Sequence, residues 1–238
     1  MYRNTDLNDF KSFLEALKHK KYEFIFFDEL TKAKGQLILR HDIDFDTIAA
    51  LETAEIENEL GIKATYFFLV TNGSYNPFDK DNLFRINKIK DLGHKISIHF
   101  DPTIYEDFEE GFKMEKKCFE TAFKTPVDVI SLHRPNDYFQ KYDRPISNCE
   151  HTYMKKYFRD IKYVSDSGGE FKYGHPFNTA EYEGNKSMHI LIHPIWWTYD
   201  GNTNHEKLKD FYHKKKEFMK SHYSANCKPF NEIKHELN

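Results

Sequence analysis

Two aspartates stand where an apolar run ends, and their spacing suits acid–base or metal chemistry. Asp42 and Asp44 follow the run 37–39, within the segment Arg40-His41-Asp42-Ile43-Asp44. Because they are two residues apart at the end of a strand, both can face the same side. One carboxylate can then bind a metal ion while the other accepts a proton. The plain alternative is a solvated turn in which Asp44 or Asp46 caps the following helix.

Two histidines end the next candidate strands. His99 lies at the end of the run 95–100, and Asp101, two residues beyond it, could share its site. The alternative is that His99 is a packed or surface residue, as a lone histidine at such a position more often is. His133 follows the apolar run 127–132. Arg134 beside it could orient a carboxylate through a bidentate hydrogen bond, or could form an ordinary ion pair at the rim.

A third histidine, His193, ends the run 188–192 and precedes Pro194. Trp196 and Trp197 follow closely and are the only tryptophans in the chain. Aromatic faces of this kind can stack on sugar rings, but adjacent aromatics after a strand are equally ordinary as core packing.

Helical and strand patterns alternate along the chain, and this alternation would position these residues. Apolar positions with helical spacing predict helices over 6–19 and 47–60, near 83–92 and 108–123, and near 208–219. Short apolar or β-rich runs predict strands at 22–27, 37–39, 64–70, 95–100, 127–132, 161–165 and 188–192, whereas 136–160 reads as irregular. Gly61 and Gly93 suit the ends of two of the helices.

This alternation predicts an α/β fold with a mainly parallel sheet. About seven strands in 238 residues suit one barrel better than two domains. We expect a single domain over 1–238, with a core at about 35–200 and a C-terminal helix at about 203–222. In such barrels chemistry occurs at the C-terminal ends of the strands, where the aspartates and histidines stand.

Composition excludes several classes of protein. Hydrophobic residues make up 39% of the chain and charged residues 31%, which argues against disorder, collagen and coiled coil. The net charge of −3 does not indicate a general polyanion-binding role. The run Lys214–Lys216 is expected to lie on a solvated helix face, so we do not expect the protein to bind nucleic acid. Nucleotide-binding glycine motifs, GxSxG and HExxH are absent.

Cysteine usage and apolar runs bear on location. The three cysteines are widely spaced, which argues against a disulfide framework and for a reducing compartment. The polar N-terminal segment lacks the apolar stretch of a signal peptide, and no run reaches the roughly 20 apolar residues of a membrane helix. We therefore expect a cytoplasmic protein without a membrane span; the oligomeric state stays open.

The ordered series of strand-end motifs resembles the polysaccharide deacetylase family of carbohydrate esterases. The resemblance covers roughly residues 35–200 and rests on LRHDIDFD (39–46), LGIKATYFF (60–68), LGHKISIHFD (92–101), SLHRP (131–135) and LIHPIWW (191–197). It implies a distorted, seven-stranded (β/α) barrel. It also implies that Asp42 is the catalytic base, Asp44 and His99 are metal ligands, Arg134 orients the base and His193 is the general acid.

The chain departs from the family pattern in three places. Ile43 separates the two aspartates, Thr103 stands where a second metal-binding histidine is usual, and Pro194 replaces an aspartate. With Thr103 at that position, His133 is our candidate for the third metal ligand, and Asp101 is the alternative.

The resemblance implies a metal-dependent hydrolase that removes an acetyl group from an N-acetylated sugar or related carbohydrate. It uses one divalent metal ion, with zinc favoured, and Trp196 and Trp197 are expected to contact the carbohydrate. The alternative is a catalytically impaired barrel that only binds carbohydrate. A different amide or ester hydrolase on the same scaffold is a third possibility, because a fold does not determine the substrate.

Overall fold

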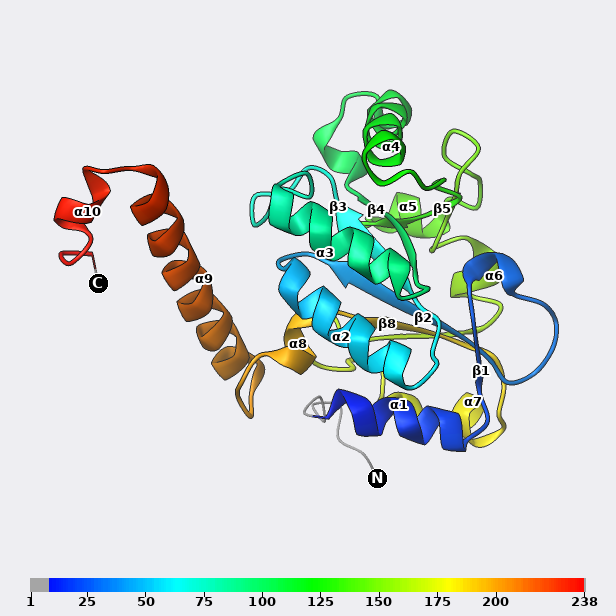
Figure 1. Ribbon diagram of the computed structural model, residues 1–238. Helices are drawn as coiled ribbons and strands as arrows, with labels where there is room; N and C mark the ends of the chain where they lie inside the picture. Colours follow the sequence, from blue (N-terminus) through cyan, green and yellow to red (C-terminus); the bar gives the residue numbers. More distant parts are fainter. Residues whose placement is uncertain (1–8, 238) are drawn as a thin grey trace. The chain divides into compact units, whose positions relative to one another are not determined.

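The computed structural model describes residues 9–237, which divide into two compact units, Met1–Thr198 and Tyr199–Asn238 (Figure 1). The smaller unit carries helices α9 (Asn204–Asn226) and α10 (Phe230–Ile233). Helix α9 begins with a capping box, in which the side chains of Thr203 and Glu206 each accept a hydrogen bond from the backbone N–H of the other. The larger unit contains the whole sheet and every candidate site residue.

An all-parallel sheet organises the larger unit. Its strands run in the spatial order β6-β5-β4-β3-β2-β8-β7, and β1 pairs separately with β2. The strands are β1 (Glu23–Ile25), β2 (Gln36–Ile43), β3 (Thr65–Leu69), β4 (Lys95–Phe100), β5 (Val129–Leu132), β6 (Glu150–His151), β7 (Lys162–Ser165) and β8 (Met188–Ile192). The sheet curls without closing, because no pairing within residues 9–237 joins β6 to β7. The predicted α/β class and barrel-like parallel sheet are confirmed.

Helices connect the parallel strands, as crossovers between such strands require. The longer connecting helices are α2 (Thr47–Glu59), α3 (Lys80–Asp91) and α4 (Phe108–Phe123), whereas α1 (Phe10–His19) precedes the first strand. Short helices and 3₁₀ turns also lie in the connections, namely η1 (Phe27–Glu29), η2 (Pro102–Ile104), α5 (Asp137–Lys141), α6 (Lys155–Phe158), η3 (Pro176–Asn178) and α7 (Ala180–Glu183). Helix α8 (Ile195–Thr198) follows β8. The first predicted helix starts at residue 6, and its residues 6–8 lie outside the described range.

Aspartate side chains cap the N-termini of α1, α2, α3 and α4, with Asp9 capping α1. Asp46 accepts hydrogen bonds from the backbone N–H groups of Ile48 and Ala49 at the start of α2, and Asp79 and Asp107 do the same for α3 and α4. Because Asp46 caps α2, the carboxylate of Asp44 is not needed for that purpose. Asp44 is therefore available to the site.

The central strands are buried along their whole length. All eight residues of β2 and all five of β3 are buried, as expected for parallel strands covered by helices. Helices α2 and α3 lie side by side on the sheet (Figure 1). The run predicted at 37–39 is thus part of a longer strand that includes Arg40, His41 and Asp42, three polar residues that a hydrophobicity pattern places outside a buried strand.

A buried polar cluster fixes α2 to the face of β2 opposite Asp42. The Glu57 carboxylate lies 2.6 Å from Nε2 of His41 and accepts a hydrogen bond of 2.7 Å from the Tyr66 hydroxyl. The rings of His41 and Tyr66 stack with centroids 4.3 Å apart, and His94 Nε2 lies 3.1 Å from the Ala54 carbonyl oxygen. These contacts give His41 and His94 structural partners away from the strand ends.

Glu115 is a buried acid beside the sheet. Its Oε1 accepts hydrogen bonds from Tyr105 and Thr71, whereas Oε2 has no partner within the described residues. Burial raises the pKa of this carboxyl from 4.5 to about 7. The folded state therefore retains a proton that the unfolded chain releases at lower pH.

This raised pKa predicts a pH-dependent stability. The stabilising effect of the retained proton is complete below the unfolded pKa and is lost as the pH rises from about 4.5 to about 7, at a cost of up to about 3 kcal/mol. We expect Glu115→Gln to raise the free energy of unfolding at pH 8 and to leave it nearly unchanged at pH 4. Urea unfolding at both pH values measures this difference. The exposed Glu110→Gln on the same helix is the control, and an equal response of both variants would contradict the prediction.

Candidate metal centre and catalytic site

A buried ion pair occupies the C-terminal half of β2. Residues two apart on a strand share a face, and Arg40 therefore lies beside Asp42. Arg40 donates two hydrogen bonds to the Asp42 carboxylate, from Nε to Oδ1 at 2.9 Å and from Nη2 to Oδ2 at 2.6 Å. The side chains are 0% and 3% exposed. This bidentate contact fixes both the charge and the orientation of Asp42.

Ser131 of β5 joins this pair to His99 of β4. Its hydroxyl lies 2.5 Å from Arg40 Nη2, 3.0 Å from Asp42 Oδ2 and 2.9 Å from His99 Nδ1. Burial by itself would raise the pKa of Asp42, but the charge and hydrogen bonds of Arg40 lower it to about 2. Asp42 is consequently an ionised hydrogen-bond acceptor at neutral pH.

Arg40 itself is enclosed by aromatic rings. Its guanidinium carbon lies 5.3 Å from the centroid of Tyr153 and 5.9 Å from that of Phe67, which favours the cation in the absence of water. Its Nη1 has no hydrogen-bond partner among residues 9–237. Asp42 is therefore the principal group that compensates this buried charge.

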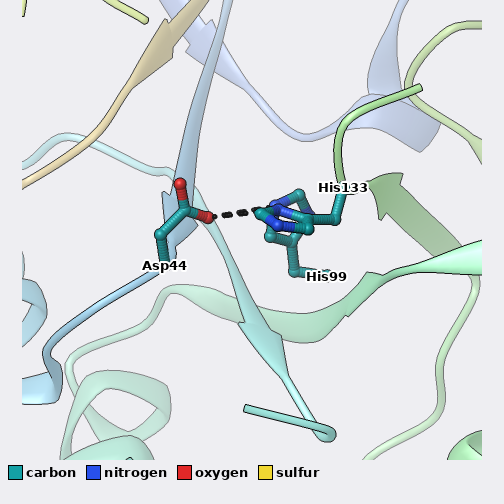
Figure 2. Close-up of side chains that lie close together, drawn as sticks. All are labelled: Asp44, His99 and His133. Carbon is teal, nitrogen blue, oxygen red and sulfur yellow. Dashed lines mark hydrogen bonds and ion pairs between the residues drawn. The ribbon is translucent and has the colours of Figure 1, made fainter. Parts of the chain in front are cut away.

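Asp44, His99 and His133 converge at the C-terminal ends of β2, β4 and β5, and Figure 2 shows the three side chains pointing toward one another. Asp44 Oδ1 lies 3.2 Å from His99 Nε2 and 3.6 Å from His133 Nδ1. The two histidine nitrogens are 2.9 Å apart. One ligand atom from each residue lies within 4.8 Å of the other two, which is close enough for all three to share one cation.

The burial, hydrogen bonding and protonation of these ligand atoms are suited to binding a metal ion. Asp44 Oδ1 is buried and has no hydrogen-bond partner in the described part of the chain. The Ser131 carbonyl oxygen, 3.4 Å from His99 Nδ1, can only accept, so we assign the His99 proton to Nδ1. Nε2 of His99 then keeps its lone pair facing Asp44, and the Ser131 contact fixes the ring. One carboxylate and two imidazoles form a ligand set suited to zinc.

The close contacts within this trio also favour the charged form of Asp44. Burial would raise the pKa of Asp44, but contacts with His133 and His99 lower it well below its ordinary value. Asp101, the alternative third ligand, lies outside the trio, because its Oδ1 accepts hydrogen bonds from the backbone N–H and the hydroxyl of Thr103 and so caps η2.

His193 follows β8 on the other side of β2, where Asp166 holds it. Asp166 follows β7 and is fully buried; its Oδ1 lies 2.6 Å from His193 Nδ1, and Trp197 Nε1 donates to its Oδ2 at 2.8 Å. Burial would lower the pKa of His193, but the charge and hydrogen bond of Asp166 raise it to about 9. His193 is therefore a protonated donor at neutral pH, with Nε2 3.9 Å from Asp44 Oδ2.

The site thus places a proton acceptor and a proton donor around one candidate metal position. Asp42 Oδ2 lies 3.7 Å from His99 Nε2, and His193 lies near the second oxygen of Asp44. Such an arrangement can take a proton from a nucleophile and give one to a leaving group, as hydrolysis of an amide or ester requires.

The structure brings together five of the predicted site residues, namely Asp42, Asp44, His99, His133 and His193. Arg134 is exposed, with a left-handed φ of 46°, and the arginine that binds Asp42 is Arg40 instead. Trp196 and Trp197 are 7% and 8% exposed. Trp197 packs on Phe10 and Phe13 of α1 and supports Asp166, so its indole has a structural role in this network.

Sequence reasoning left Arg40, Ser131 and Asp166 out of the site. Because side chains two apart on a strand share a face, the position of Arg40 two residues before Asp42 was a usable signal. Asp166 could also have been found, since it follows a predicted strand as His193 does. Ser131 carried no signal, because it lies inside an apolar run and a serine there has many structural uses.

No family model and no curated protein matches this chain. Solved structures do match it at low identity. The Xyl-CE4 domain of a multidomain xylanase from the hindgut metagenome of Trinervitermes trinervoides is 14% identical, with 76% of this chain and 83% of that chain covered and a TM-score of 0.42. The Streptococcus pyogenes deacetylase PplD in complex with acetate is 15% identical, with 87% and 86% covered and a TM-score of 0.45.

A third match is BA3943 from Bacillus anthracis, described as a CE4 family pseudoenzyme. It is 16% identical, with 82% of this chain and 68% of that chain covered and a TM-score of 0.41. Two of these three solved structures, the Xyl-CE4 domain and BA3943, carry the CE4 designation, and the third is a deacetylase.

Proposed function

We propose that this protein is a metal-dependent hydrolase that removes an acetyl group from an N-acetylated sugar or a related carbohydrate. The observation that carries the proposal is the convergence of three groups at one edge of the sheet: the Arg40–Asp42 pair, the Asp44–His99–His133 trio and the Asp166–His193 pair. Structural packing needs no such combination of a protonated histidine, a buried ionised aspartate and clustered imidazoles. The three free cysteines agree with a reducing, cytoplasmic setting.

Each group has one role in the proposed reaction. Asp44, His99 and His133 would hold the metal ion, which when bound supplies Lewis-acid polarisation of the acetyl carbonyl and a lower pKa for the attacking water. The Asp42 carboxylate, held by Arg40 and Ser131, accepts the proton of that water. His193, held by Asp166, donates a proton to the departing amine. Arg40 thus positions the base and Asp166 positions the acid.

Metal content is the direct test of the ligand set. We expect about one divalent ion per purified chain, and we expect Asp44→Ala, His99→Ala and His133→Ala each to weaken zinc binding at least about 100-fold, because each removes one of three protein ligands. Inductively coupled plasma mass spectrometry and zinc titration measure both quantities. Asp101→Ala is the matched control and should keep its metal.

Two outcomes would contradict this assignment. Metal loss in Asp101→Ala with retention in His133→Ala would make Asp101 the third ligand. A wild-type protein that takes up no divalent ion even after supplementation would remove the hydrolase proposal and would leave a carbohydrate-binding barrel as the better interpretation.

A further inference from the structure

A groove of about 1260 Å³ runs along β7, the strand at one end of the sheet. Within the described chain β7 pairs with β8 alone, so its other edge faces the gap where the barrel does not close. The walls come from segments 30–34, 153–167 and 172–187 together with Pro135 and Gln140, all within the larger unit. None of the residues assigned to the catalytic groups lines this groove.

The groove is strongly basic, although the whole chain has a net charge of −3. Seven basic and two acidic side chains line it. Within residues 9–237, six of the basic side chains form no ion pair: Lys32, Lys34, Arg159, Lys162, Lys172 and Lys186. Uncompensated charges of one sign along a groove create a local positive potential, which a ligand of opposite charge relieves.

The groove also offers the surfaces that sugars use. The rings of Tyr153, Phe158 and Tyr163 form a continuous aromatic wall, with successive centroids 4.9 Å apart. Tyr173 at the edge is 85% exposed, an unusual state for so large a ring. Ring faces can pack on the C–H faces of pyranoses, and the hydroxyls of Ser165 and Ser167 can exchange hydrogen bonds with sugar hydroxyls.

One end of the groove adjoins the catalytic groups. Ser165 and Ser167 line it and flank Asp166, the residue that holds His193. The ring centroid of Tyr153, on the groove wall, lies 5.3 Å from the Arg40 guanidinium carbon. A chain-like ligand seated along β7 would therefore lead toward the strand ends.

We propose that this groove binds an anionic carbohydrate, one that bears carboxylate or phosphate groups, and that the deacetylase acts on such a glycan. The binding part stands by itself, whereas the second part rests on the proposed function. The basic side chains account for the charge preference, and the aromatic wall accounts for a sugar over a bare polyanion.

Calorimetric titration with matched charged and neutral glycans tests the proposal, with Asp42→Asn protein so that the probes are not consumed. One pair is a hyaluronan hexasaccharide against chitohexaose, and the other is mannopentaose phosphate against mannopentaose. We expect at least one charged glycan to bind at least about tenfold more tightly than its neutral partner, with an affinity that falls as salt rises from about 50 to about 200 mM. The charged member that binds identifies carboxylate or phosphate as the recognised group.

Charge reversal inside and outside the groove locates the binding. Arg159→Glu/Lys162→Glu should weaken binding of the charged glycan at least about tenfold, whereas the control Lys80→Glu/Lys117→Glu, on exposed lysines of α3 and α4, should change it less than about twofold. Acetyl release from neutral chitohexaose, measured in the otherwise wild-type background, should be unchanged in the control double variant Lys80→Glu/Lys117→Glu.

The proposal is overturned if charged and neutral glycans bind equally, or if both charge-reversed variants behave alike. It is also overturned if single-stranded DNA of equal charge binds as tightly as the acidic glycan, because the groove would then recognise charge alone. Groove-dependent binding without acetyl release from any glycan by wild-type protein would instead contradict the proposed reaction and support the binding site.

Discussion

Asp42→Asn should lower kcat/KM for acetyl release by about 10²–10⁴-fold, the usual contribution of a positioned general base. The amide has nearly the same shape as the carboxylate but cannot take a proton from water at neutral pH. Asp42 lies outside the Asp44–His99–His133 trio, so the metal content should stay at the wild-type level. Steady-state kinetics on an N-acetylated oligosaccharide, together with metal analysis of the same sample, measures both effects.

Asp101→Asn is the matched control for this substitution. Asp101 is an aspartate at the same edge of the sheet, but it caps η2 and has no hydrogen bond to the catalytic groups. Asparagine caps helices about as well as aspartate, so this variant should retain nearly full activity. An Asp42→Asn enzyme that kept more than about a tenth of wild-type activity would show that another group accepts the proton.

Arg40→Met should destabilise the fold by about 3–5 kcal/mol, the usual cost of breaking a buried ion pair from one side. The pair is almost entirely excluded from solvent, and the substitution leaves the Asp42 carboxylate without its strongest compensating charge. Urea unfolding at pH 7 measures the loss. Arg134→Met, which changes the exposed arginine, should shift the free energy of unfolding by no more than about 0.5 kcal/mol.

A double-mutant cycle separates the charge from packing effects. If the cost of Arg40→Met arises from an uncompensated carboxylate, then Arg40→Met/Asp42→Asn should be less unstable than the sum of the two single variants, by about 0.5–3 kcal/mol. Strict additivity would assign the loss to the contacts of Arg40 with Tyr153 and Phe67 instead. An Arg134→Met variant as unstable as Arg40→Met would contradict the assignment of Arg40 to Asp42.

Much of the architecture could be read from local patterns. Helices and strands bury apolar residues with different periods, so the seven predicted strands all occur in the structure. Because parallel strands end at one edge, the histidines at the ends of 95–100, 127–132 and 188–192 could be expected to meet Asp42 and Asp44. The two-residue strand β6 (Glu150–His151) was not predicted, since two polar residues inside an irregular segment have no detectable period.

Which side chains contact one another at the site could not be predicted from local sequence patterns. Arg134 and Arg40 both stand next to candidate site residues along the chain, and only the backbone decides between them. A left-handed φ at Arg134 accompanies its exposed position, whereas the continuation of β2 through Asp42 buries Arg40 on the same face. The Trp pair was equally ambiguous, because a tryptophan that packs in the core and one that stacks on a sugar look alike in sequence.

The sequence by itself determined the class of fold and the order of the strands that carry acidic and imidazole side chains. It also showed that no long apolar segment is present. In agreement, no helix within residues 9–237 is long and apolar enough to span a membrane. The tertiary structure decided which residues touch: Arg40 and Ser131 with Asp42, Asp166 with His193, and His133 with Asp44 and His99. Periodicity reports only on burial and on local backbone geometry. Contacts between strands distant in the chain depend on register and side-chain direction, which arise only when the sheet has assembled.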